Sequence, residues 1–406
     1  MWTACNLFLQ SFPQALHQSM LHAGEVNATG KAKIEPFIDM LCDRFTQIYC
    51  PPPEISIDEM VVGFKGRWKF KQYNASKPSK YHIKSFGLCD SSNGYVLNLL
   101  TYYGSQTSYD PATDPNSVAS VKIFDKLLSC VGKGYHVFAD RWYVTKALVD
   151  YMLEKGHYFT GTVQSNRVGF PPQVKQGLQL GHLDSTYYAT ADNKIMYCAW
   201  KDKKAKKPVL IVSTKTLIGD TLSSRKNVPK PIVIDNYNQF MSGCDRADQL
   251  VGYHGHQNRK STKWWKKLFF WILEVSMMNA FILFKSTRPG PLTKHQVKSL
   301  TFVNYKKSLI KQLEAKGVSL TDLSGGDAGT GDASVRRHVG RPKKNVPASP
   351  IDLLTPGQHI IVKGTGIRRC KHCSTPSAVK RTLYYCKTCP TNPYLHPDCF
   401  EAFHRL

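Results

Sequence analysis

The sequence is poor in acidic residues, and no apolar run in it is both long and uninterrupted. Its 29 Asp and Glu stand against 55 Lys and Arg, so the 406-residue chain has a formal net charge of +26. Such an excess favours a polyanionic partner, with nucleic acid ranked before an anionic membrane surface. The most membrane-like stretch, 268–284, contains Glu274, Ser276 and Asn279, so we interpret it as a buried core helix. Residues 1–18 lack the basic start of a secretory signal.

Cysteine is scattered over the first 244 residues and crowded only in the tail. Five of the twelve cysteines follow Thr365, and they lie among histidines at short, paired spacings. This clustering is typical of metal binding in a reducing compartment. So short a segment cannot fold on apolar burial alone, which predicts structural Zn²⁺. The potential ligands are Cys370, Cys373, Cys386, Cys389, His396, Cys399 and His404.

The order of the predicted elements indicates a mixed α/β fold. Periodicity predicts three strands of an antiparallel meander, then a helix, a strand, a helix and a strand, and finally an acidic helix over 235–254. This is the order of a ribonuclease-H-like fold, in which the first strand lies beside the fourth. In chain order the ranges are a preceding helix at 32–49, then 54–64, 81–88, 95–103, 118–130, 134–139, 145–155 and 158–163.

Composition divides the chain further. Short strand-like runs at 185–190, 194–200 and 208–213 predict a β-rich insertion, whereas the Gly-, Ser- and Pro-rich stretch before the Cys/His tail could build no core. The expected divisions are a weakly structured segment 1–30, a flanking helix 31–53, the core 54–163, the insertion 164–230, the acidic helix 231–257, a helical DNA-binding and dimerisation region 258–318, a linker 319–357 and a zinc domain 358–406.

Four aspartates are candidates for catalysis. Asp58 and Asp140 stand in the predicted first strand and at the end of the fourth, while Asp245 and Asp248 share one face of the acidic helix. Carboxylates from three distant segments, Asp58, Asp140 and Asp245, predict a site for Mg²⁺ or Mn²⁺ that assists phosphoryl transfer. For any single Asp, a solvated residue, a helix cap or a turn former is the alternative.

Several motifs in register resemble the piggyBac transposase family. In order they are SIDEMVVGFKGR, KPSKYHIKSFGLCDSSNGYVLNLLTYYG, FADRWYVTKAL, FTGTVQSNRVGFP, YNQFMSGCDRADQL, RKSTKWWKKLFFWILEVSMMNAFIL and the Cys/His tail. The resemblance extends from about Lys33 to the C-terminus. It implies a ribonuclease-H-like catalytic core with a β-rich insertion, flanking helices that bind DNA and dimerise, and a small C-terminal cross-braced zinc module.

The resemblance also implies roles for single residues. The three catalytic aspartates of the family fall on Asp58, Asp140 and Asp245, and a further important acidic residue falls on Asp248. His359 is nominated as the eighth ligand of two Zn²⁺ ions, with His372 as a competing candidate. The implied reaction is metal-dependent cleavage and transfer of DNA strands at TTAA targets, by a nuclear homodimer that needs neither a membrane nor a small-molecule substrate.

A basic and aromatic run precedes the apolar helix. Its cationic side chains could neutralise phosphates and its rings could stack on bases; alternatively, the lysines are solvated and the tryptophans belong to the core. The run comprises Arg259, Lys260, Lys263, Trp264, Trp265, Lys266 and Lys267. A second basic run, 336–344, could serve as a nuclear signal, as a minor-groove arm or as a solvated stretch.

Three hypotheses follow from the sequence. The first is a piggyBac-like transposase, or a protein derived from one, that retains the metal ligands for strand cleavage. The second is a domesticated nuclear protein that binds DNA or chromatin without cutting. The third is a zinc-dependent protein-interaction module with a vestigial core.

Overall fold

The computed structural model describes residues 30–173, 179–215, 218–222, 229–253, 255, 260–287, 300–315, 361–375, 378–387 and 392–404. The chain divides into two compact units, Met1–Leu323 and Ser324–Leu406. The predicted linker and the second basic run lie outside the described residues.

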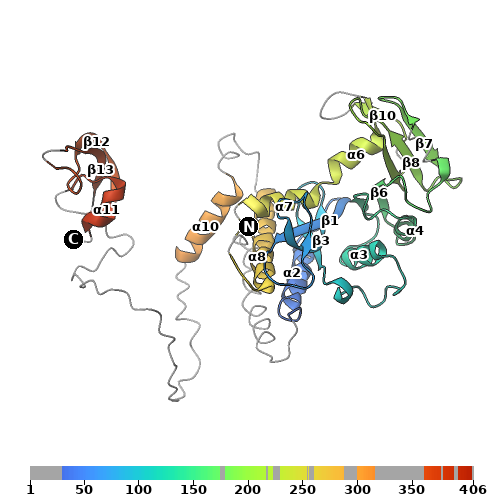
Figure 1. The fold of residues 1–406 in the computed structure, drawn as a ribbon, viewed down its shortest axis with the longest axis horizontal. Coiled ribbons are helices and arrows are strands. Elements are labelled where there is room, and N and C mark those ends of the chain that lie inside the picture. Colours follow the sequence, from blue (N-terminus) through green and yellow to red (C-terminus); the bar gives the residue numbers. More distant parts are fainter. Residues whose placement is uncertain are drawn as a thin grey trace, which may run out of the picture. The chain divides into compact units, whose positions relative to one another are not determined.

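A mixed sheet forms the centre of the first unit (Figure 1). The long strands β1 (Glu54–Gly63) and β3 (Tyr81–Asp90) pair in antiparallel fashion, and β4 (Val96–Thr101) and the short β2 (Gln72–Tyr73) both pair with β3. On its other side β1 pairs in parallel with β5 (His136–Ala139), which pairs in parallel with β6 (Tyr158–Val163). The expected contact between the first strand and the strand that ends before Asp140 is confirmed.

The strands expected to form an insertion continue this same sheet. The order runs from β6 to β9 (Val209–Ser213), β8 (Met196–Trp200) and β7 (Ser185–Ala189), all antiparallel. Two short strands, β10 (Asp220–Leu222) and β11 (Pro229–Pro231), form a separate pair. The region is therefore β-rich as predicted, and its first three strands extend the core sheet.

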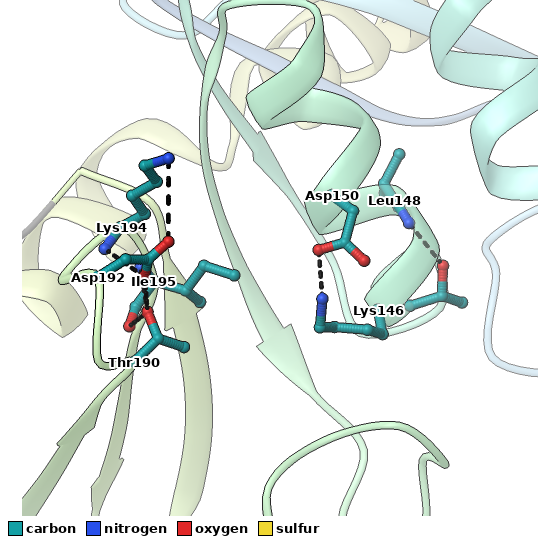
Figure 2. A network of polar contacts seen from close by, with 8 residues as sticks. Lys146, Leu148, Asp150, Thr190, Asp192, Lys194 and Ile195 are labelled. Atoms are coloured by element: carbon teal, nitrogen blue, oxygen red, sulfur yellow. Dashed lines mark hydrogen bonds and ion pairs between the residues drawn. The ribbon is translucent and has the colours of Figure 1, made fainter.

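Local polar contacts stabilise a turn in this region and the start of a helix that precedes it (Figure 2). At the turn between β7 and β8, Asp192 Oδ1 accepts from Thr190 Oγ1 at 2.6 Å and from Lys194 N at 3.2 Å. Helix α4 (Lys146–Glu154) begins at Thr145, whose hydroxyl accepts from Leu148 N at 3.1 Å. One turn along α4, Lys146 pairs with Asp150 on the exposed side of the helix.

Helices pack on both faces of the sheet. α2 (Glu35–Ile48) begins beside Pro36, ends before the three prolines at 51–53, and packs along β4 through its buried face. α3 (Ala119–Leu128) packs on β4, α4 packs on β6, and the two helices contact each other. A short 3₁₀ turn, η1 (Gly104–Gln106), follows β4. Side chains of β3 alternate between the two faces of the sheet, so they contact different layers. Phe86 contacts Tyr143 on one face, and Cys89 contacts Cys244 on the other.

The apolar helix α8 (Trp264–Ser286) packs on α2, α7 and β1. Of the helices in the described part of the chain, α8 alone is long and apolar enough to cross a membrane. Two of its buried polar side chains have partners inside the protein. Glu274 pairs with Lys306 of α10 (Phe302–Ala315) at 3.1 Å. Asn279 bonds both the N–H and the carbonyl of Val96, at 2.9 and 2.8 Å. This packing is that of a core helix, as the sequence pattern predicts.

The described part of the second unit contains a two-stranded sheet and one helix. β12 (Ile361–Arg369) pairs in antiparallel fashion with β13 (Arg381–Cys386), with an irregularity between Lys363 and Arg368. Helix α11 (Pro397–His404) follows. Two cysteines of this unit, Cys370 and Cys386, are buried.

Candidate active site and metal centre

Asp58 and Asp140 are brought together by the parallel pairing of β1 and β5. The last paired residues of the two strands are Ile57 and Ala139, so each aspartate is the next residue along its strand. Asp58 Oδ1 accepts from Glu59 N at 2.7 Å, and Asp140 Oδ1 accepts from Trp142 N at 2.7 Å. Local main-chain N–H groups therefore orient both carboxylates.

The other two aspartates lie on α7, and here the prediction of one continuous helix is wrong. Residues 232–253 form two helices, α6 (Ile232–Phe240) and α7 (Gly243–Tyr253), with a break at Met241 and Ser242. α6 packs on Phe138 of β5 and on Trp200 of β8, whereas α7 packs on β1 and β3. One straight helix would have to follow both surfaces, and the glycine at 243 has low helix propensity at the point where the direction changes.

Close contacts hold the start of α7 against the sheet. A Cβ on Gly243 would lie 2.8 Å from the carbonyl oxygen of Asp90, so only glycine fits there without displacement. The thiol of the next residue, Cys244, is 3.4 Å from the Gly87 carbonyl oxygen and 3.3 Å from Cys89 Sγ. This packing places Asp245, which is exposed in the first turn, and Asp248, which is half-buried, beside β1.

The aspartates act on one another electrostatically. Burial raises the pKa of Asp58 to about 7, and the charges of Asp140 and Asp245 add to this rise. Burial likewise raises the pKa of Asp248 to about 7, with the charges of Asp245 and Asp58 acting in the same direction. Mutually repelling carboxylates with raised pKa values are the electrostatic signature of a cation site.

The donor set fits a hard divalent cation, because it consists of carboxylate oxygens from β1, the end of β5 and α7. Within the described residues, the compact group of three or more possible ligands is a Cys/His group of the second unit. Asp58, Asp140 and Asp245 do not form such a compact group, so they are a candidate cation site by their donor chemistry and mutual electrostatics.

Two residues near the carboxylates were missed by sequence reasoning. The charge of Lys77, in the connection between β2 and β3, lowers the pKa of both Asp58 and Asp248, opposing the effect of burial. Tyr237 of α6 is only 9% exposed, and its hydroxyl is 3.5 Å from Thr162 Oγ1. Burial, followed by smaller contributions that include the charges of Asp140, Asp58 and Asp245, raises the pKa of Tyr237 to about 12. Neither residue belongs to a spacing pattern that marks a site; only the fold brings them to it.

The basic and aromatic run at the start of α8 is divided between surface and interior. Lys260, Lys263 and Lys266 are exposed, Lys267 is buried, and Arg259 lies outside the described residues. Trp264 is half-buried and stacks on Trp68, with ring centroids 4.8 Å apart and planes 21° apart. Trp265 is also half-buried, and the Lys266 ammonium lies 5.6 Å from its ring. Both tryptophans pack against the core, as one of the two alternatives predicts.

The second unit contains a compact group of metal-ligand side chains. The ligand atoms of Cys370, Cys373, His396 and Cys399 all lie within 4.8 Å of one another. Cys373 Sγ is 3.3 Å from His396 Nδ1, and His396 Nε2 lies 3.0 Å from the carbonyl oxygen of Arg381. A carbonyl at the far nitrogen of a ligand histidine fixes its ring orientation. Three sulfurs and one imidazole in this arrangement fit a structural Zn²⁺.

Two thiols of this group, those of Cys370 and Cys399, have shifted pKa values. Although burial acts in the opposite direction, N–H groups of Cys373, His396 and His372 lower the pKa of Cys370 to about 6. Burial and the hydrogen bond to Cys373 raise the pKa of Cys399 to about 12. Metal binding at this group is therefore expected to release a proton from the Cys399 thiol.

The remaining predicted zinc ligands are mostly outside the described residues. Cys386 is buried at the end of β13, while Cys389 and His359 fall outside the description, as does the side chain of His404. His372 is exposed and is not part of the Cys/His group.

The fold and sites define a strongly basic, mixed α/β protein with an acidic cluster in its first unit and a Cys₃His group in its second. More specifically, the chain belongs to the family described as Transposase IS4, whose model matches residues 11–281. Within that family it is of the piggyBac type, as the relatives and the solved structure below show. The match starts earlier than Lys33, where the sequence motifs placed the start of the resemblance.

Two human relatives carry piggyBac names. The chain is 24% identical over 385 residues to PiggyBac transposable element-derived protein 3 of Homo sapiens, covering 92% of this chain and 59% of that protein. It is 24% identical over 277 residues to PiggyBac transposable element-derived protein 2 of Homo sapiens, covering 64% of this chain and 45% of that protein. The chain thus spans less than two thirds of the length of either relative.

A solved structure has a similar fold. It is the cryo-EM structure of the piggyBac transposase synaptic complex with hairpin DNA, with a TM-score of 0.56 and 24% sequence identity. The match covers 74% of this chain and 63% of that chain.

Proposed function

We propose that the first unit is a ribonuclease-H-like DNA-cleaving core, and that the protein is a piggyBac-type transposase or derives from one. The observation that carries this proposal is the convergence of Asp58, Asp140 and Asp245 from β1, the end of β5 and α7. Membership of a transposase family supports it, as does the fold shared with a transposase solved in complex with hairpin DNA.

The residues of the site have different proposed roles. Asp58, Asp140 and Asp245 would hold Mg²⁺ or Mn²⁺, which when bound supplies the charge that activates a hydroxyl and stabilises the leaving oxygen. Asp248 stays oriented because its Oδ2 accepts from Val61 N at 3.3 Å. Water and then a freed 3′-hydroxyl serve as nucleophiles in the proposed reaction, so the protein forms no covalent intermediate.

The substrate in this proposal is double-stranded DNA at transposon ends and TTAA targets. The net charge of +26 supports a polyanionic substrate. The exposed Lys260, Lys263 and Lys266 precede or begin α8, where they are available to phosphates. We further propose that the protein acts in the nucleus as a homodimer.

The second unit completes the proposal as a cross-braced zinc module. One Zn²⁺ would be held by Cys370, Cys373, His396 and Cys399, whose ligand atoms already lie together. The other would be held by Cys386 with Cys389, His404 and His359. In this arrangement the Cys386 and Cys389 pair of one site lies in the sequence between the two ligand pairs of the other, which ties β12, β13 and α11 together.

Strand cleavage tests the proposed activity. A labelled duplex carrying a TTAA-flanked transposon end is incubated with the protein and Mg²⁺ or Mn²⁺, and nicked, hairpin and joined products are resolved. We expect product from the parent, none from Asp140→Asn, and parent-like product from Asp150→Asn, which changes an exposed aspartate on α4. Equal product from the parent and Asp140→Asn would refute the assignment of the site.

A second candidate function is DNA binding without cleavage. It is favoured by the net charge of +26 and by the exposed Lys260, Lys263 and Lys266, because phosphate binding by these groups needs no working metal site. It predicts salt-sensitive binding of the duplex with no product in either metal.

A further inference from the structure

Trp142 presents an exposed aromatic ring two residues after Asp140. The residue is 45% exposed although its ring stacks on Phe86, with centroids 6.2 Å apart and planes 20° apart. The ring of Tyr143 meets it edge-on at 4.8 Å and 86°. Because the indole is supported from within the protein and still open to solvent, it offers a flat apolar surface in a fixed orientation.

A lysine and a glutamate complete the support. The Lys84 ammonium lies 4.5 Å from the centre of the Trp142 ring and 4.7 Å from that of Phe86. Lys84 also forms an ion pair with Glu59, and both side chains are largely shielded from solvent. The lysine thus braces both rings while its charge is balanced, so the exposed indole does not depend on a ligand to keep its position.

The supported ring is tied to the acidic cluster by the main chain. The N–H of Trp142 donates to Asp140 Oδ1 at 2.7 Å, so the carboxylate and the residue that carries the ring are held together. Side chains alternate along β1, so Glu59 and Asp58 lie on opposite faces of the strand. Trp142 is thus bonded to one aspartate of the cluster and, through Lys84 and Glu59, linked to the strand that carries another.

We propose that Trp142 stacks on an unpaired nucleobase of the DNA strand whose phosphodiester lies at the aspartates. The ligand class is a nucleobase out of its duplex stack, without preference for base identity, because every base offers a π-face to an indole. This inference rests on the proposed function, since it requires DNA at the carboxylates. Trp142 would hold the strand in position while taking no part in proton or metal chemistry.

The test measures base stacking and binding by the full, zinc-loaded chain. The probe is a DNA duplex with one unpaired 2-aminopurine next to the TTAA-flanked strand end, compared with a fully paired duplex, in a buffer without added Mg²⁺ or Mn²⁺, which prevents cleavage while the structural zinc stays bound. Stacking on the indole should quench the 2-aminopurine fluorescence on binding. In Trp142→Leu, which keeps apolar cover over Phe86 without a π-face, we expect the quenching to disappear. Affinity for the unpaired probe should then fall about 5- to 150-fold, and Trp142→Phe should restore much of both signals.

A matched control comes from Tyr158, at the opposite, amino end of the parallel strands. It is also 45% exposed, and a lysine, Lys215, lies 5.6 Å from its ring. Tyr158→Leu should leave quenching and affinity unchanged. The stacking proposal is overturned if Trp142→Leu quenches like the parent, or if it weakens paired and unpaired probes equally. In the first case binding by the parent leaves the proposed function intact, whereas a parent that binds neither probe overturns both proposals.

Discussion

The backbone N–H of Val61 in β1 donates to Oδ2 of Asp248 in α7 at 3.3 Å, across 187 positions of sequence. One side of β1 pairs with β3. On the other side its first four residues pair with β5, and the strand also contacts α7. Asp248 thus has a structural role, satisfying a strand N–H, besides its charge in the acidic cluster. These two roles can be separated by substitution.

Asp248→Asn should preserve the bond and remove the charge. The amide oxygen can still accept from Val61, while repulsion with Asp245 and Asp58 disappears, so we expect stability equal to or above that of the parent. Asp248→Ala leaves the N–H without its acceptor and should cost about 1–3 kcal/mol. Urea denaturation of the two variants measures the difference. If Asn and Ala are equally destabilising, the hydrogen bond is not what Asp248 contributes.

Gly243 should be the glycine of α7 least tolerant of alanine. The added Cβ would lie 2.8 Å from the Asp90 carbonyl oxygen, which is backbone and cannot rotate away. Gly243→Ala must therefore displace α7 with Asp245 and Asp248, and we expect a loss of about 1–3 kcal/mol together with loss of any metal-dependent cleavage.

Gly252 provides the control for that substitution. It lies in the same helix, and a Cβ there meets nothing within 4 Å. Gly252→Ala should raise stability by about 0.4–1 kcal/mol through lower entropy of the unfolded chain. Thermal unfolding of both variants tests the pair, and a Gly243→Ala protein as stable as Gly252→Ala would contradict the close packing of α7.

Much of the fold and of the candidate site is predictable because it depends on local patterns. The strand ending at Ala139 and the long strand through Asp58 follow from alternation and turn residues, and their order predicts that they pair. The break before Gly243 is not predictable in this way, because the periodicity of 235–254 is helical on both sides. Only the two separate packing surfaces, near Phe138 and near Asp90, require it.

Contacts set by tertiary structure alone escaped prediction. Lys77 has no spacing relation to Asp58 or Asp248, yet its charge acts on both. Trp264 was equally compatible with the core and with DNA on sequence grounds, because a basic aromatic helix start fits either role. Its stacking on Trp68 is part of the packing against the hydrophobic core.

Zinc content should respond differently to neighbouring residues of the second unit. Cys373→Ser and His396→Ala each remove a member of the compact group, so bound zinc should fall by about one ion per chain. His372→Ala, one residue before Cys373, changes an exposed histidine outside the group and should leave the zinc content unchanged. Metal analysis of the purified variants decides this, and zinc loss in His372→Ala would reverse the assignment.

Stability should depend on pH through the acidic cluster, and Mg²⁺ should oppose this dependence. Asp58 and Asp248 each have a pKa raised from 3.8 to about 7, so between these values the folded protein binds more protons than the unfolded chain. The free energy of unfolding should therefore decrease as pH rises from about 4 to about 7, by at most about 1.4 kcal/mol per pH unit for each group, and level off above.

A bound divalent cation favours the charged carboxylates, so millimolar Mg²⁺ should stabilise the protein most above neutral pH. Asp58→Asn should flatten the pH profile and reduce the Mg²⁺ effect, while Asp150→Asn should alter neither. Urea titrations across this pH range, with and without Mg²⁺, measure both effects, and stabilisation by Mg²⁺ that is undiminished in Asp58→Asn would place the cation elsewhere.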